Sequence, residues 1–179
     1  MNALMTIGAI AATSAVASAQ LDLGQFEGQW DNNTFGSTGA ASMLVESLGG
    51  ADVSLTIDLD GFVFGGDDPD PFTITGTVGA TGFVADPFMN PGFGTFSGGV
   101  DENGVVAIDL IDAAEGAFSL VTLRGTAIGD SVQLDYEIFT PNSPTAPFAI
   151  GEINMRLVPA PGSIALFGIG GLIISRRKR

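Results

Sequence analysis

The sequence predicts an all-β protein of about ten antiparallel strands, arranged as a β-sandwich or an up-and-down β-barrel. Between Gln20 and Leu157, short segments in which apolar and polar residues alternate are separated by clusters of Gly, Asp, Asn and Pro. No stretch between these limits has the apolar spacing of a helix. A sandwich and a barrel produce the same local pattern, so the sequence leaves both open.

The first half of this segment contains the clearest alternation. Val53, Leu55, Ile57 and Leu59 alternate with Asp, Ser and Thr, which predicts a strand with one buried and one wet face. Residues 25–31 predict a first strand in the same way. The other strands expected in this half cover residues 41–46, 72–78 and 83–84, with a turn at 60–61 that leads into 62–64 and irregular segments at 65–71 and 86–92.

The second half predicts two hairpins and a final strand. Asn103-Gly104 and Gly129-Asp130 are typical hairpin turns. The strands expected around them cover residues 93–100, 105–111, 117–127 and 131–139, and the last strand, 148–157, follows a Pro-rich loop at 140–147. Alternation places Tyr136 on the inward face of its strand, and Trp30 likewise in the first strand.

The beginning of the chain predicts a secretory signal peptide. Residues 1–19 contain an apolar stretch from Ala3 to Val16, expected to be helical, and end in Ala17-Ser18-Ala19, a small-residue cleavage pattern. No Lys or Arg precedes the apolar stretch, which departs from the usual form. We expect signal peptidase to cut between Ala19 and Gln20, and the protein to be exported.

The end of the chain predicts a short membrane-embedded helix. Gly162 to Ser175 is 14 residues without a charge, and a helix of that length covers about 21 Å against a hydrocarbon core of about 30 Å. Local bilayer thinning can accommodate the difference. The four basic residues that follow resist translocation and place the preceding domain on the far side of the membrane. They are Arg176, Arg177, Lys178 and Arg179.

The tail, residues 158–179, resembles the PEP-CTERM sorting signal. It begins with Val158, Pro159, Ala160 and Pro161, continues with a Gly-punctuated apolar helix and ends with the basic cluster. Ala160 stands where the commoner pattern has Glu. The resemblance implies recognition by an exosortase, a membrane-embedded cysteine protease and transpeptidase. It also implies transient anchoring and delivery to the cell surface or an exopolysaccharide matrix. An ordinary C-terminal membrane anchor is the alternative.

Composition excludes several function classes. All 20 acidic residues but only Arg124 and Arg156 among the basic ones lie between residues 20 and 157, so this segment carries a formal charge of −18 and is repelled by nucleic acid. The chain has no His or Cys, which removes a Ser-His-Asp triad, a thiol nucleophile and the usual zinc sites. We therefore expect no enzyme, although a carboxylate pair for glycoside hydrolysis stays an alternative.

One acidic cluster is a candidate calcium site. Asp58 and Asp60 share a face at the end of a predicted strand, and further carboxylates follow in a Gly-rich loop, at Asp67, Asp68 and Asp70. Ca²⁺ takes six to eight oxygen ligands, which such a loop can supply. The chain has no EF-hand spacing, and Asp, Gly and Pro are also common in solvated turns. No other cofactor is expected.

Aromatic residues bear on glycan binding, the remaining alternative. The only Trp and the only Tyr both lie in the inward register. Several Phe residues lie in loops or beside Gly, among them Phe35, Phe88 and Phe93, and form a candidate exposed patch for a partner. The sequence thus favours a non-enzymatic surface or matrix protein, with a carbohydrate-binding module or a carboxylate-based glycosidase as the alternative.

Overall fold

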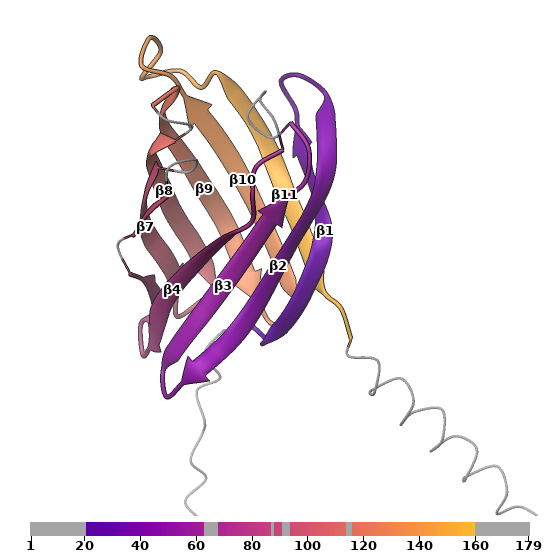
Figure 1. Cartoon of the computed structure of the whole chain (residues 1–179), viewed down its shortest axis with the longest axis vertical. Coiled ribbons are helices and arrows are strands. Elements are labelled where there is room, and N and C mark those ends of the chain that lie inside the picture. The colour runs from indigo at the N-terminus through magenta and orange to yellow at the C-terminus, as the bar shows by residue number, and fades with distance from the viewer. Residues whose placement is uncertain (1–20, 63–67, 87, 91–93, 114–115, 160–179) are drawn as a thin grey trace, which may run out of the picture.

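A computed structural model describes residues 21–62, 68–86, 88–90, 94–113 and 116–159, which form eleven β-strands in one antiparallel sheet (Figure 1). The strands are β1 (Gly24–Asn32), β2 (Ser37–Gly49), β3 (Asp52–Leu59), β4 (Phe72–Gly79), β5 (Gly82–Ala85), β6 (Phe88–Asn90), β7 (Gly94–Asp101), β8 (Val105–Ala113), β9 (Phe118–Ile128), β10 (Ser131–Phe139) and β11 (Ala149–Leu157).

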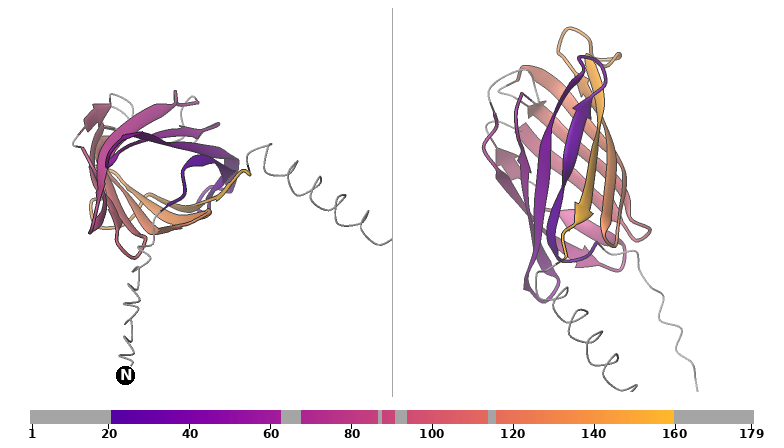
Figure 2. Two further views of the ribbon diagram at one scale, coloured as in Figure 1. Left: turned by 90° about the horizontal axis from the view of Figure 1, so that it is seen from below. Right: turned by 90° about the vertical axis from the view of Figure 1, so that its right-hand side faces the viewer.

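The sheet closes on itself into an up-and-down barrel. From β1 to β5 and from β7 to β11, strands that follow one another in sequence lie side by side, and the pairings β1–β11 and β5–β7 complete a ring of ten strands. Figure 2 shows this ring from below. Among the described residues, the eleventh strand, β6, pairs with β7 alone and flanks the ring. The all-β prediction is confirmed, and of its two architectures the barrel is the one observed.

The core lies inside the barrel, because each strand turns alternate side chains inward. In β11, buried Ala149, Ile153 and Met155 alternate with exposed neighbours. Trp30 and Tyr136 face inward as predicted and are almost fully buried. The largest fully buried side chains are Trp30, Phe26, Phe96, Ile74, Ile138 and Val121. Burying a side chain of this size contributes about 1.5–3 kcal/mol.

The predicted hairpins are present. At the β7–β8 turn, Asp101 Oδ1 accepts hydrogen bonds from the backbone N–H groups of Asn103 and Val105, both at 2.8 Å, and Gly104 has a φ of 78°. Hydrogen bonds from these amides, Val105 first, lower the pKa of Asp101. The β9–β10 turn contains Gly129 at a φ of 56°. Both positions favour Gly because other residues rarely adopt a positive φ.

Three sequence-based expectations need correction. Strand β6 lies in the segment 86–92, which was expected to be irregular because it contains prolines. Prolines are tolerated beside a strand that pairs along only one edge, as β6 does with β7. Strand β2 extends well beyond residues 41–46 at both ends. Phe62 belongs to no strand. Residues 63 and 64, and the signal and tail helices, lie outside the described residues.

The barrel has two dissimilar rims. Both ends of the described chain lie at one of them, which we call the terminal rim: the Asp22 N–H donates to the Gly129 carbonyl at 3.0 Å, and the Val158 N–H donates to the Gln25 carbonyl at 2.7 Å. The hairpin turns after β2, β4, β7 and β9 share this rim (Figure 1). The connections after β1, β3, β8 and β10 form the opposite, distal rim.

Candidate functional site

The interior of the barrel contains an apolar cavity of about 100 Å³. Ten strands enclose more space than the inward side chains fill. Apolar side chains from β1 round to β11 line the cavity, among them Trp30, Ile57, Phe96, Leu123, Leu134 and Ile153. Several lining residues, including Leu123 and Leu134, are only half-buried although they point inward, because they face this empty space.

A second cavity, of about 70 Å³, lies between the first one and the terminal rim. The two cavities share three lining residues, Leu21, Leu55 and Val100. Leu21 precedes β1 and forms a bridge with Gly129, so it lies across this end of the barrel. Asp101 and Glu102, both exposed, complete the lining on the rim side. The apolar interior therefore reaches an acidic rim.

Trp30 lines the cavity and is fixed by a hydrogen bond. Its Nε1–H donates to the backbone carbonyl of Asp60 at 2.8 Å. The indole ring lies over Gly39, where a Cβ would overlap it. The β3–β4 connection is thereby attached to the inner wall of β1 near the distal rim.

Tyr136 carries an unusual hydroxyl group. The residue is only 4 % exposed, and its hydroxyl has no hydrogen-bond partner among the described residues. The ring lies over Gly151, where a Cβ would overlap it. Burial, with a smaller contribution from the charge of Asp31, raises the pKa of Tyr136 to about 12. The hydroxyl therefore stays protonated at neutral pH, which suits a hydrogen-bonding group and not a base.

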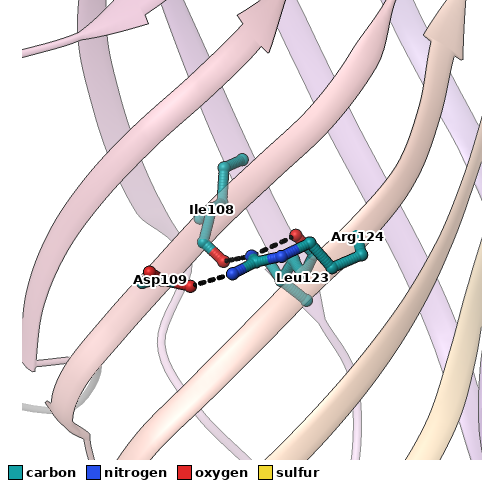
Figure 3. Close-up of polar contacts among 4 residues, drawn as sticks. All are labelled: Ile108, Asp109, Leu123 and Arg124. Carbon is teal, nitrogen blue, oxygen red and sulfur yellow. Dashed lines mark hydrogen bonds and ion pairs between the residues drawn. The ribbon is translucent and has the colours of Figure 1, made fainter.

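The two arginines of the described part lie on the outer face. Arg124 donates to the carbonyls of Ile108 and Leu123, at 2.6 and 2.9 Å, and forms an ion pair with Asp109 at 2.6 Å (Figure 3). A guanidinium nitrogen of Arg156 lies 3.9 Å from the Asp130 carboxylate oxygen Oδ2, and both side chains are exposed. Neither guanidinium lines either cavity. The interior thus receives no positive charge from the described residues.

The acidic cluster is brought together in part. Partial burial, and then the negative charges of Asp60 and Asp68, raise the pKa of Asp58. Asp68 Oδ1 accepts a hydrogen bond from the Gly61 N–H at 2.6 Å. No group of three or more carboxylates among the described residues is placed to hold a metal ion. Asp70 lies in the same loop, and Asp67 lies outside the described residues, so calcium binding stays a prediction.

Of the predicted processing residues, the structure places only the first two of the sorting motif. Val158 and Pro159 follow β11 at the terminal rim, where Leu21 also lies. The part of the chain that the structure describes contains no helix long and apolar enough to cross a membrane. The other processing residues lie outside it, namely Ala17, Ala19, Gln20, Ala160, Pro161, Arg176, Arg177, Lys178 and Arg179.

Exposed aromatic rings gather at the distal rim. Phe35 is 60 % exposed and Phe148 is 51 % exposed, and their ring centroids are 5.4 Å apart. The ring centroid of Phe148 is also 6.4 Å from that of Phe118, which is buried. Of the three Phe residues expected in a patch, the structure shows Phe35 exposed; it does not describe Phe93 or the side chain of Phe88. Sequence reasoning missed Phe148, whose signal was its position beside the Pro-rich loop.

Comparison with protein-family models, curated proteins and solved structures finds no match to this chain. Its function is therefore inferred from its own residues and geometry.

Proposed function

We propose that this protein is exported and displayed at the cell surface or in an extracellular matrix, with the barrel as non-enzymatic cargo. The observation that supports this most directly is the position of the two chain ends. Leu21 follows the predicted signal cleavage site, Val158 begins the predicted sorting motif, and both lie at the terminal rim. An exosortase acting on the tail at the membrane would therefore work at this rim, with the distal rim facing away.

The character of the barrel walls supports a role in display or binding. Apolar side chains line the main cavity, and the one hydroxyl among them, that of Tyr136, is protonated at neutral pH. Nearly all charged residues of the domain are acidic, and none of those that the structure describes is buried, which suits a soluble domain outside the cell. The proposed partners are signal peptidase, an exosortase, the membrane through the tail helix, and an exopolysaccharide.

Cell fractionation tests the sorting role of the tail. The intact chain is compared with a version that ends at Leu157. We expect the intact chain in the surface or matrix fraction and the truncated one free in the medium or the periplasmic space. Mass spectrometry of the mature C-terminus then distinguishes cleavage near Val158 from retention of an ordinary anchor. Identical distributions of the two versions would remove the sorting role.

Site-directed labelling tests the orientation. The chain has no Cys, so single substitutions report one site each. Phe35→Cys places a thiol at the distal rim, and Leu48→Cys places one at the terminal rim on a residue that is 59 % exposed. On intact cells, a bulky membrane-impermeant maleimide should label the distal thiol several-fold faster while the tail is anchored. Equal rates on anchored protein would contradict the orientation.

Glycan binding is a second candidate, favoured by the exposed rings of Phe35 and Phe148 at the distal rim. Such a pair offers flat apolar surface to a sugar ring. Affinity electrophoresis in polysaccharide gels should show retardation that Phe35→Ala abolishes and that Val84→Ala, on the exposed outer wall, leaves unchanged. A carboxylate-based glycosidase stays a prediction of the sequence alone.

A further inference from the structure

We infer that the barrel interior is a binding site for an unbranched hydrocarbon chain with an uncharged head, such as an alcohol of about eight carbons. The chain would enter at the terminal rim and extend inward, with the head left near Asp101 and Glu102. This site does not depend on surface display and would exist wherever the folded barrel is found.

The first argument is the shape and chemistry of the space. The cavities of about 100 and about 70 Å³ share the lining residues Leu21, Leu55 and Val100, so they are adjacent and follow one another from the terminal rim into the barrel. An apolar cavity of comparable size stays dry and takes apolar molecules. Each methylene transferred from water into such a space tightens binding by about fourfold. A slender aliphatic chain extends through two adjacent cavities more readily than a globular ligand does.

The second argument is charge, which determines the head group. Neither Arg124 nor Arg156 lines the two cavities, and both side chains bind acidic residues on the outside. Among the described residues a carboxylate head would have no positive partner within the barrel, and at the rim it would meet the negative Asp101 and Glu102. An anionic head is therefore disfavoured both inside the barrel and at the acidic rim, whereas a neutral head is tolerated at the rim.

The third argument concerns the route. Near the distal rim, Trp30 is held by its hydrogen bond to Asp60, and Tyr136 packs tightly over Gly151. At the terminal rim, Leu21 lies outside the eleven strands and is joined to the barrel by an isolated β-bridge to Gly129. Displacing Leu21 breaks fewer contacts of the folded structure than displacing Trp30 would. Entry at the terminal rim therefore requires the smaller rearrangement.

The fluorescence of Trp30 can report binding inside the barrel. Trp30 is the only Trp and lines the main cavity. The full chain, anchored in a phosphatidylcholine nanodisc, is titrated with 8-bromooctanol, whose bromine quenches indole fluorescence on contact. We expect saturable quenching that unlabelled octanol reverses. Octanoate, which is ionised at neutral pH, should compete at least about tenfold less well than octanol.

Matched variants show whether the quencher lies inside the barrel. Val100→Phe fills the junction of the two cavities, whereas Val84→Phe makes the same change at an outer-wall position that is 59 % exposed. We expect the first to weaken binding at least tenfold and the second by less than twofold. Should Val100→Phe not fold, Leu21→Asn introduces a polar group at the shared lining, with Leu48→Asn as its exposed control. Non-saturable quenching, equal effects within both pairs, or tighter binding of octanoate than of octanol would overturn the inference.

Discussion

The barrel ring is closed by two pairings between strands that do not follow one another in the chain, and the two are unequal. Strand β1 pairs with β11 from Phe26 opposite Leu157 to Asn32 opposite Gly151, seven residue pairs in all. Strand β5 pairs with β7 over three, from Gly82 opposite Asp101 to Val84 opposite Gly99. The first closure joins the ends of the domain, and the second joins strands in the middle of the chain.

The two closures also differ in what their side chains bury. Strand β1 contributes Phe26 and Trp30, both fully buried. In the β5–β7 closure, Phe83 is half-buried, Val84 is exposed, and Gly82 has a φ of 102° with its α-carbon so close to the Val100 carbonyl that a Cβ would overlap it. The short closure therefore depends mainly on backbone hydrogen bonds. We expect it to open locally while the long closure opens only when the barrel unfolds.

Hydrogen exchange should show the largest difference between the closures. Amides of β1 and β11 should exchange only through global unfolding, whereas those of β5 should exchange through local opening. We expect protection factors to differ by about 1,000-fold, which corresponds to about 4 kcal/mol. Native-state exchange followed by mass spectrometry of peptides from the two regions measures this. Equal protection would show that the two closures open together.

Gly151→Val should break the long closure. A Cβ there would overlap the Tyr136 ring and the carbonyl of Asp31, so the substitution should lower the free energy of unfolding by about 3 kcal/mol. Gly79→Val, beside the short closure, is the matched control, since a Cβ at Gly79 meets nothing within 4 Å. Urea denaturation compares the two variants. A control as unstable as Gly151→Val would contradict the expected difference.

Alkaline pH should weaken the packing of Tyr136 against β11. The pKa of Tyr136 is about 12 in the folded barrel against an ordinary value of 10.0, so the unfolded chain loses its proton first as pH rises. The stabilisation is fully present below about pH 10 and is lost as pH rises through about 12, which lowers the free energy of unfolding by up to about 3 kcal/mol. Because the chain has one Tyr, ultraviolet absorbance follows this titration directly.

Tyr136→Phe is the control for that titration. Stability of this variant between pH 10 and 12 should not show the Tyr-dependent fall. At neutral pH the variant should be as stable as the parent protein or about 1 kcal/mol more stable, since the hydroxyl has no partner among the described residues. A marked loss of stability at neutral pH would show that the hydroxyl is satisfied.

The smallest effect should come from the outer wall between the closures. Arg124→Ala removes an ion pair whose two side chains are 48 % and 41 % exposed. Solvent screens such a pair, so the free energy of unfolding should fall by about 0.5 kcal/mol and less at high salt. Urea denaturation at low and high salt measures it. A loss above about 2 kcal/mol would mean that the hydrogen bonds to Ile108 and Leu123 support the sheet.

Most strands were predictable because each has one face in the core. Alternation in the sequence follows directly from that, as in β11, and Asn103-Gly104 identified its hairpin. In β3 the polar face is not wet as predicted: Ser54 is buried, and Thr56 and Asp58 are half-buried. Closure was not predictable, because a sandwich and a barrel require the same local pattern and differ only in long-range pairings such as Trp30 opposite Ile153. Strand β6 was missed because its three residues stand between prolines.

The candidate site was predictable only in part. Inward positions for Trp30 and Tyr136 followed from alternation, and the closeness of Asp58 and Asp60 followed from their spacing. The cavity could not be inferred from the sequence, because residues such as Leu123 look like ordinary core until the number of strands in the ring is known. The pairing of Phe35 with Phe148 joins residues far apart in the chain, which no local pattern reveals.

The location of Val158 has a mechanical consequence. It directly follows β11, which lies between β1 and β10 in the ring. Interstrand hydrogen bonds run perpendicular to the strands, so tension applied through the tail acts along β11 and shears both of its ladders at once. A tether attached at Val158 therefore loads many interstrand hydrogen bonds in parallel. A tether that pulled perpendicular to a strand would break its hydrogen bonds one at a time.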